Sequence, residues 1–320
     1  MKIFENLWNI WIDLFRQNKK KELTPKPEPN PIIIEKPKPE PDPIILEKDF
    51  SAVAGKGAFL YDLSPLYAEF GSSAGIAAWL KSLGMNNAWM RIVGKAGWSS
   101  TQTKAQAKNL IRECNEIGVK VGAWGYIYNS QPEKYADYVV QYVQELGLDC
   151  FIHNAEKEWE GNKKQMEILA ERYWKVINEN LPSNIVHGLS TFWNPDLHSN
   201  FPYSVFMKYC SVNCPQIYHV LKDPVPVLKK GIELNSRFNK PLVITTQFFW
   251  NELGITEQTA TRDVIIMCEK WNTDLKDIVL NNKVIGFNHW YCGGKGAHAF
   301  NETMRKEYSN FSPILTNFKI

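Results

Sequence analysis

Eight apolar runs that alternate with helix-like segments predict an α/β fold, a closed (β/α)8 or TIM barrel, from about residue 50 onward. The chain of 320 residues is long enough, since such a barrel needs about 250. Several helix-like segments end just before the next run at Gly84, Gly118 and Gly147, where glycine can form a left-handed helix cap. A doubly wound sheet is the competing fold, but the glycine-rich phosphate turn expected after its first strand is missing.

The expected strands are short and rich in β-branched and aromatic residues. In chain order they cover residues 58–64, 87–94, 119–128, 148–156, 184–193, 211–218, 241–250 and 284–292. Apolar residues recur at helical spacing between them, and the clearest helices are expected at residues 105–118, 132–147 and 166–182.

Two zones precede the barrel. Residues 1–21 have the spacing of an amphipathic helix and end in three lysines, so they could lie on a membrane, dock on a partner or fold back on the barrel. Residues 22–49 are a Pro-rich linker, in which KPEPNPIIIEK is repeated as KPEPDPIILEK, typical of a semi-rigid polyproline II spacer. Glu5 and Asp13 interrupt the N-terminal apolar stretch and no cleavage site follows, so we expect no Sec signal and synthesis in the cytoplasm.

The composition of the chain gives no support to nucleic-acid binding or metal binding and favours sugar binding. The net charge of +3 gives no reason to expect a nucleic-acid partner. The six cysteines and the histidines show no metal-binding spacing, so we expect reduced core cysteines, no metal and no cofactor. The 12 Trp and 13 Tyr residues are suited to a cleft in which sugar rings stack on aromatic side chains.

Glu156 is the main candidate for catalysis, because barrel enzymes place function at the C-terminal ends of their strands. Side chains alternate along a strand, so Asn154 and Glu156 share one face. A carboxyl group that ends a strand inside an aromatic cleft can act as a general acid. The alternative is a surface glutamate that begins a helix, a description that suits Glu158 and Glu160 better.

Asp62 is the expected second carboxylate, at the end of the first strand. Its alternative role is a helix N-cap within the sequence Asp-Leu-Ser-Pro. Two carboxylates across a cleft are the minimum arrangement for glycoside hydrolysis. The other strand ends supply the side chains expected to contact sugar, namely Arg91, Trp124, Tyr126, Trp193, Gln216, Tyr218, Gln247, Trp250, His289 and Trp290.

These motifs resemble known glycosidases. Asp62 in LYDLS and Glu156 in NAE are similar to the pattern of family 25 glycoside hydrolases, the lysozyme-type muramidases of many phage endolysins. Residues 149–156 are similar to half of the family 18 chitinase signature, and NAEKEWEG at residues 154–161 resembles DAEKEYEG in barrel glycosidases of phages and bacteria. The resemblance covers most of the barrel in architecture but only short motifs in sequence.

One residue departs from both families, because Asn154 stands where they usually have Asp. Asn can hold a substrate acetamido group or orient Glu156, but it cannot act as a base or a nucleophile. This puts in doubt any mechanism that needs a carboxylate at that position.

The resemblance implies a hydrolase of peptidoglycan-type, N-acetylated cell-wall glycan, encoded by a phage and made in the host cytoplasm. Glu156 would be the general acid, Asp62 the second carboxylate and Asn154 the residue that positions the N-acetyl group. The N-terminal zones would attach the barrel to a membrane or a virion protein. The alternatives are a non-catalytic carbohydrate-binding or virion structural protein on the same barrel, and a lyase or aldolase, which would need a lysine or a metal in the cleft.

Overall fold

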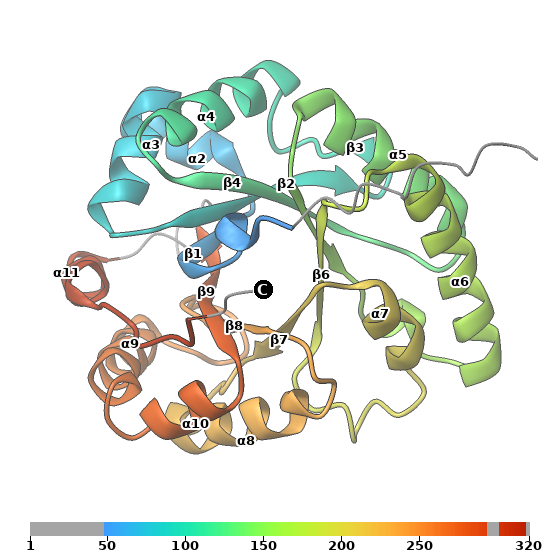
Figure 1. Ribbon diagram of the computed structural model, residues 1–320. Helices are drawn as coiled ribbons and strands as arrows, with labels where there is room; N and C mark the ends of the chain where they lie inside the picture. The colour runs from blue at the N-terminus through green and yellow to red at the C-terminus, as the bar shows by residue number, and fades with distance from the viewer. Residues whose placement is uncertain (1–47, 293–300, 318–320) are drawn as a thin grey trace, which may run out of the picture. The chain divides into compact units, whose positions relative to one another are not determined.

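The computed structural model describes residues 48–292 and 301–317. The expected amphipathic helix and nearly all of the Pro-rich linker therefore lie outside the described residues. Within them, eight parallel strands close into a barrel ringed by helices (Figure 1). Pairing of the first strand with both the second and the last closes the sheet. The predicted (β/α)8 barrel is confirmed.

The barrel strands are shorter than the expected runs in most cases. They are β1 (Gly55–Leu60), β2 (Asn87–Gly94), β4 (Lys120–Tyr126), β5 (Cys150–Asn154), β6 (Val186–Phe192), β7 (Val212–Ile217), β8 (Leu242–Gln247) and β9 (Val284–Cys292). A two-residue strand, β3 (Gly97–Trp98), pairs antiparallel with β2 outside the barrel.

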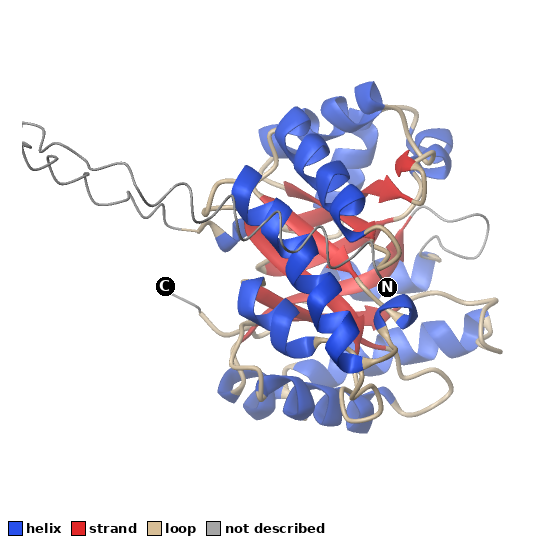
Figure 2. Ribbon diagram, turned by 90° about the vertical axis from the view of Figure 1, so that its right-hand side faces the viewer, coloured by secondary structure: helices blue, strands red, loops and turns tan. Residues whose placement is uncertain are grey.

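Helices pack around the outside of the sheet (Figure 2). They are α2 (Leu63–Phe70), α3 (Ser73–Ser82), α4 (Lys104–Glu116), α5 (Pro132–Leu146), α6 (Lys163–Asn180), α7 (Tyr203–Tyr209), α8 (Pro224–Ser236), α9 (Glu257–Trp271), α10 (Lys276–Asn281) and α11 (Glu302–Asn310), with short 3-10 turns η1 (Phe50–Ala52) and η2 (Lys157–Trp159). No helix in the described part of the chain has the length and apolar character needed to cross a membrane.

The helix ends follow the expected chemistry. Gly84, Gly118 and Gly147 have φ values of 70°, 75° and 61°, which is the left-handed conformation predicted for them. At the other end of α4, the Thr103 side chain accepts from the backbone of Gln106 and the Gln106 side chain accepts in return. These caps set where each helix turns back toward the next strand.

The barrel interior is filled by aromatic side chains. Phe59 makes edge contacts with Trp89 and Trp124, at centroid distances of 4.9 and 5.6 Å. The turn η1 covers the N-terminal end of the barrel, where the Trp89 indole donates a 2.8 Å hydrogen bond to the Ala52 carbonyl. Because side chains fill the middle and η1 covers the N-terminal end, the C-terminal ends of the strands are left to form a site.

Candidate active site

A polar cluster lies where β5, β6 and β7 end. The Gln216 side-chain amide donates to Glu156 Oε1 at 2.9 Å, to Asn154 Oδ1 at 2.8 Å and to Ser190 Oγ at 3.1 Å. Asn154, Ser190 and Gln216 face the barrel interior from three neighbouring parallel strands, and Glu156 follows two residues after Asn154. The structure thus places Glu156, Asn154 and Gln216 together, with Glu156 partly exposed to solvent.

Two tyrosines flank this cluster. Tyr126, at the end of β4, donates a hydrogen bond to Glu158. Burial raises the pKa of Tyr218 well above its ordinary value, and the charges of Glu156 and Glu252 raise it further. Burial, the bond to Glu158 and the nearby carboxylates likewise raise the pKa of Tyr126. Both hydroxyls therefore stay protonated; that of Tyr126 donates to Glu158, and that of Tyr218 can donate a hydrogen bond beside Glu156.

An aromatic wall forms the opposite side of the barrel mouth. Trp290 lies 5.1 Å from Trp124 and 6.1 Å from Tyr61, measured between ring centroids. Trp124 is only 1% exposed, so it forms the floor, while Trp290 and Tyr61 are partly exposed. The Arg91 guanidinium lies 4.7 Å from the Tyr61 ring centroid. The mouth combines a carboxylate, amides and partly exposed rings, the mixture that sugar recognition uses.

Three residues expected to contact sugar pack against the core between strands and helices. His289 is fully buried and stacks on Phe248 at 4.7 Å, and burial lowers its pKa to about 3. Because Trp290 points inward, its neighbour His289 points to the helix layer. Trp250 is 7% exposed and belongs to the core between strands and helices. Trp193 packs against that same core, and its carbonyl accepts a hydrogen bond from Asn235 on α8. His289 and Trp250 therefore belong to the buried core, whereas the sugar contact expected of Trp193 stays a prediction.

Asp62 has the role of a helix cap. Its Oδ1 accepts a 2.8 Å hydrogen bond from the Ser64 backbone at the start of α2. The adjacent Tyr61 is the residue of this strand end that packs on the barrel interior. The N-cap alternative is therefore observed, and the role of Asp62 as the second carboxylate stays a prediction.

Gln247 shapes a neighbouring loop. It is 2% exposed, and its Oε1 accepts a 2.7 Å hydrogen bond from the Val220 backbone, two residues after Tyr218. Val220 has a φ of 46°, a strained value for a β-branched residue. Gln247 thus holds the turn that carries Tyr218 at the mouth.

Sequence reasoning missed Ser190, Tyr61 and Glu252. Ser190 could have been found, because it follows Val186 and Gly188 on the inward face of β6. Glu252 lies in the loop after β8, where no periodicity guides a prediction. Its carboxylate is hydrogen-bonded to Tyr291, and its charge acts on Tyr218 together with that of Glu156.

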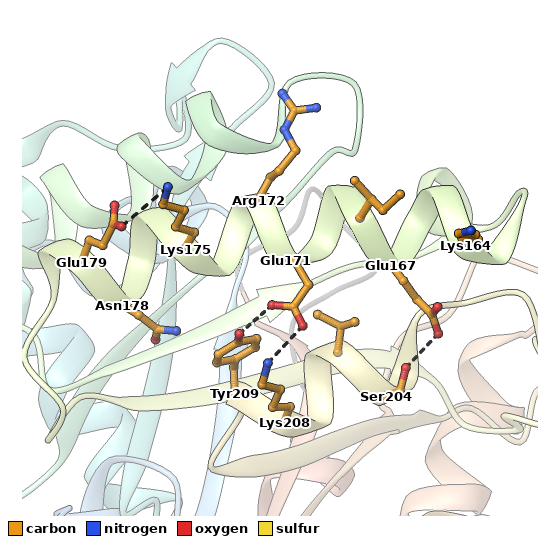
Figure 3. A pocket seen from close by; sticks show the side chains of 12 residues that line it. Lys164, Glu167, Glu171, Arg172, Lys175, Asn178, Glu179, Ser204, Lys208 and Tyr209 are labelled. Atoms are coloured by element: carbon orange, nitrogen blue, oxygen red, sulfur yellow. Dashed lines mark hydrogen bonds and ion pairs between the residues drawn. The ribbon is translucent and has the colours of Figure 1, made fainter.

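An open groove of about 940 Å³ lies on the outer surface, away from the strand ends (Figure 3). It exists because α7 has seven residues and covers only part of α6, which has eighteen. Within this groove, the Glu171 carboxylate accepts hydrogen bonds from Tyr209 at 2.6 Å and from Lys208 at 3.2 Å.

Nowhere in residues 48–292 and 301–317 do three His, Cys, Asp or Glu side chains converge to hold a metal ion.

Fold and site together define a (β/α)8 barrel with a glutamate at the C-terminal end of its fourth barrel strand, β5. No family model matches the chain, and no curated protein sequence does. Similar solved structures include the spore cortex-lytic enzyme SleL of Bacillus megaterium, with TM-score 0.54, 6% identity, and coverage of 83% of this chain and 75% of that chain.

Two further solved structures share the barrel. One is active domain 2 of a thermostable chitinase from Pyrococcus furiosus, with TM-score 0.55, 14% identity, and coverage of 81% and 94% of the two chains. The other is endoglucanase Cel5A of Pseudomonas stutzeri, with TM-score 0.52, 10% identity, and coverage of 84% and 98%. At these identities the likeness shows the fold alone.

Proposed function

We propose that this protein is a glycoside hydrolase of N-acetylated cell-wall glycan, with Glu156 as its general acid. The observation that carries the proposal is the Glu156 carboxyl group at the barrel mouth, bonded to Gln216 and flanked by the hydroxyls of Tyr126 and Tyr218. The solved structures of similar fold include a spore cortex-lytic enzyme and a chitinase, which supports the choice of substrate class.

The reaction begins when Glu156 donates its proton to the glycosidic oxygen, which leaves as a hydroxyl group. Because Asp62 caps α2, we assign the attack on the anomeric carbon to the acetamido oxygen of the substrate itself. Asn154 and Tyr218 hold that acetamido group. Water then opens the cyclic intermediate and returns a proton to Glu156, so that one water molecule is consumed.

We base a more specific form of the proposal on the motif resemblance to muramidases. A muramidase of phage lysin type, attached through residues 1–49, is the specific form we favour. That attachment would raise the local concentration of the barrel at the wall.

Reducing-end release from purified peptidoglycan tests the proposal. The wild type is expected to release sugar, and Glu156→Gln to be at least about 100-fold slower, as for loss of a general acid. Glu167→Gln, on the outer groove where it meets only Ser204, is a matched control expected to keep full activity.

A second function is favoured by one observation, namely Asn154 in place of a carboxylate. In that case the barrel binds glycan without cleaving it. Binding of peptidoglycan by the wild type and Glu156→Gln alike, with no reducing ends from either, would establish this alternative.

A further inference from the structure

Arg91 differs from the other arginines in the described part of the chain. Five of the six form an ion pair with a carboxylate, namely Arg112, Arg172, Arg237, Arg262 and Arg305. Arg91 has no such partner among the described residues, and its buried Nε–H has no acceptor there.

The Arg91 side chain is fixed at the barrel mouth. It projects inward from β2, two residues beyond the interior Trp89, and its guanidinium carbon lies 4.7 Å from the Tyr61 ring and 5.5 Å from the Trp124 ring. Contact of the cation with two ring faces favours this position of the guanidinium before any ligand binds.

The same cation lies on the rim that carries the proposed acid, because Trp124, which Arg91 contacts, is on β4, and β4 pairs with β5 directly before Glu156. Burial raises the pKa of the Tyr128 hydroxyl, Glu158 and Glu156 raise it as well, and Arg91 opposes them. Tyr128 is therefore within electrostatic reach of both Arg91 and Glu156. A sugar bound at Glu156 would place its substituents within the field of Arg91.

We propose that Arg91 binds a carboxylate of the substrate, so that the glycan cleaved at Glu156 is an acidic one. The inference rests on the proposed function and names its substrate class. A planar guanidinium forms two parallel hydrogen bonds to a carboxylate, and a neutral glycan of the chitin type offers no such group. The two sources of such a carboxylate are the lactyl group of N-acetylmuramic acid that carries no stem peptide, and a uronic acid.

The test compares kcat/KM on two matched oligosaccharides of alternating N-acetylglucosamine and N-acetylmuramic acid, one with free lactyl carboxylates and one with these amidated. The wild type is expected to prefer the free acid by about 10-fold or more, the usual effect of a hydrogen bond to a charged group. Arg91→Gln should lose this preference, so that its kcat/KM falls by about 10-fold more on the free acid than on the amidated form. Arg91→Lys, which keeps the charge without the planar fork, should recover part of it.

Two results would overturn the inference, namely equal wild-type activity on both oligosaccharides, or an equal loss on both in Arg91→Gln. Arg237→Gln, which breaks a surface pair with Asp196, is the matched control and should behave as the wild type. An N-acetylated oligosaccharide carrying a hexuronate forms the third arm. A larger Arg91-dependent preference for it than for the muramate would assign the carboxylate to a uronic acid.

Calorimetric binding of the same oligosaccharides separates this inference from the proposed function. If the wild type cleaves none of them, the hydrolase proposal fails. Tighter binding of the free acid that disappears in Arg91→Gln would still support the carboxylate site, whereas equal binding of free and amidated forms would remove it.

Discussion

Strands β5 and β6 carry two polar clusters on opposite faces of the sheet, and on β5 their members His153 and Asn154 are adjacent in sequence. On the inward face, Asn154 and Ser190 are neighbours in register and share Gln216 as a donor. On the outward face, His153 lies 2.6 Å from the Tyr173 hydroxyl and 3.0 Å from His187. The first cluster includes the partly exposed Glu156, and the second is sealed beneath α6.

The difference shows how burial decides what a titratable group does. Burial holds the pKa of His153 well below its ordinary value and lowers that of His187 to about 3. Neutral imidazoles each offer one donor and one acceptor, so the Tyr173 hydroxyl can donate to His153 and His153 to His187. The outward cluster therefore stabilises the fold, whereas the inward cluster keeps a carboxyl group available to a ligand.

The largest effect is expected from breaking the outward cluster. His153→Ala leaves a cavity and removes the partner of Tyr173 and of His187, so unfolding free energy should fall by about 3 kcal/mol or more. Urea denaturation measures it. Ser190→Ala, on the inward face of the neighbouring strand, is the control and should cost less than about 1.5 kcal/mol. Equal losses in the two variants would contradict the division of roles.

Acid should weaken the same cluster. The unfolded histidines take up protons below pH 6.5, whereas His187 in the folded state does so only near pH 3. The unfolded state thus binds more protons between these values, and unfolding free energy should fall with falling pH by about 1.4 kcal/mol per pH unit for each such histidine. Denaturation at several pH values should give a shallower slope for His187→Asn, and an unchanged slope would mean that another group dominates.

A change to the inward cluster should affect activity more than stability. Gln216→Leu removes the donor that links Glu156 to Asn154, and kcat should fall by about 10-fold to 100-fold, as expected when a catalytic group loses its orientation. Unfolding free energy should change by less than about 1.5 kcal/mol because the site is partly hydrated. Steady-state kinetics on peptidoglycan, combined with a denaturation curve, separates the two effects.

The smallest effect is expected at Asp62. Asn is as good an N-cap as Asp, so Asp62→Asn should change stability by less than about 0.5 kcal/mol, while Asp62→Ala costs about 1 kcal/mol. Neither should reduce kcat by more than about twofold if Asp62 only caps α2. A loss of 100-fold in Asp62→Asn would instead identify it as the second carboxylate.

Much of the fold could be predicted from apolar runs and glycine caps. The runs at residues 87–94 and 284–292 coincide with β2 and β9. The run at 58–64 was misplaced, because β1 begins at Gly55 and the chain enters α2 at Leu63. The expected strand ran on to Ser64, although Leu63 and Ser64 already belong to α2. Pro65 follows in the first turn of this helix, where proline is tolerated.

The site was harder to predict, because alternation defines two faces of a strand without saying which one points inward. That ambiguity placed His289 at the mouth, although its neighbour Trp290 occupies that face. Trp193 and Trp250 follow strands as loop residues, whose direction depends on tertiary contacts such as that of Asn235 with the Trp193 carbonyl. Glu156 and Gln216 were predicted from their positions at strand ends, and the structure joins them by a hydrogen bond.

The turn η1 covers the N-terminal end of the barrel, so that a ligand enters from the C-terminal end. Ala52 and Val53 pack with Phe59 and Trp89 and fill the N-terminal end of the barrel in the described part of the chain. A polymeric ligand therefore reaches Glu156 from the C-terminal rim. Under the proposed function, both fragments would depart from the side on which the glycan strand arrived.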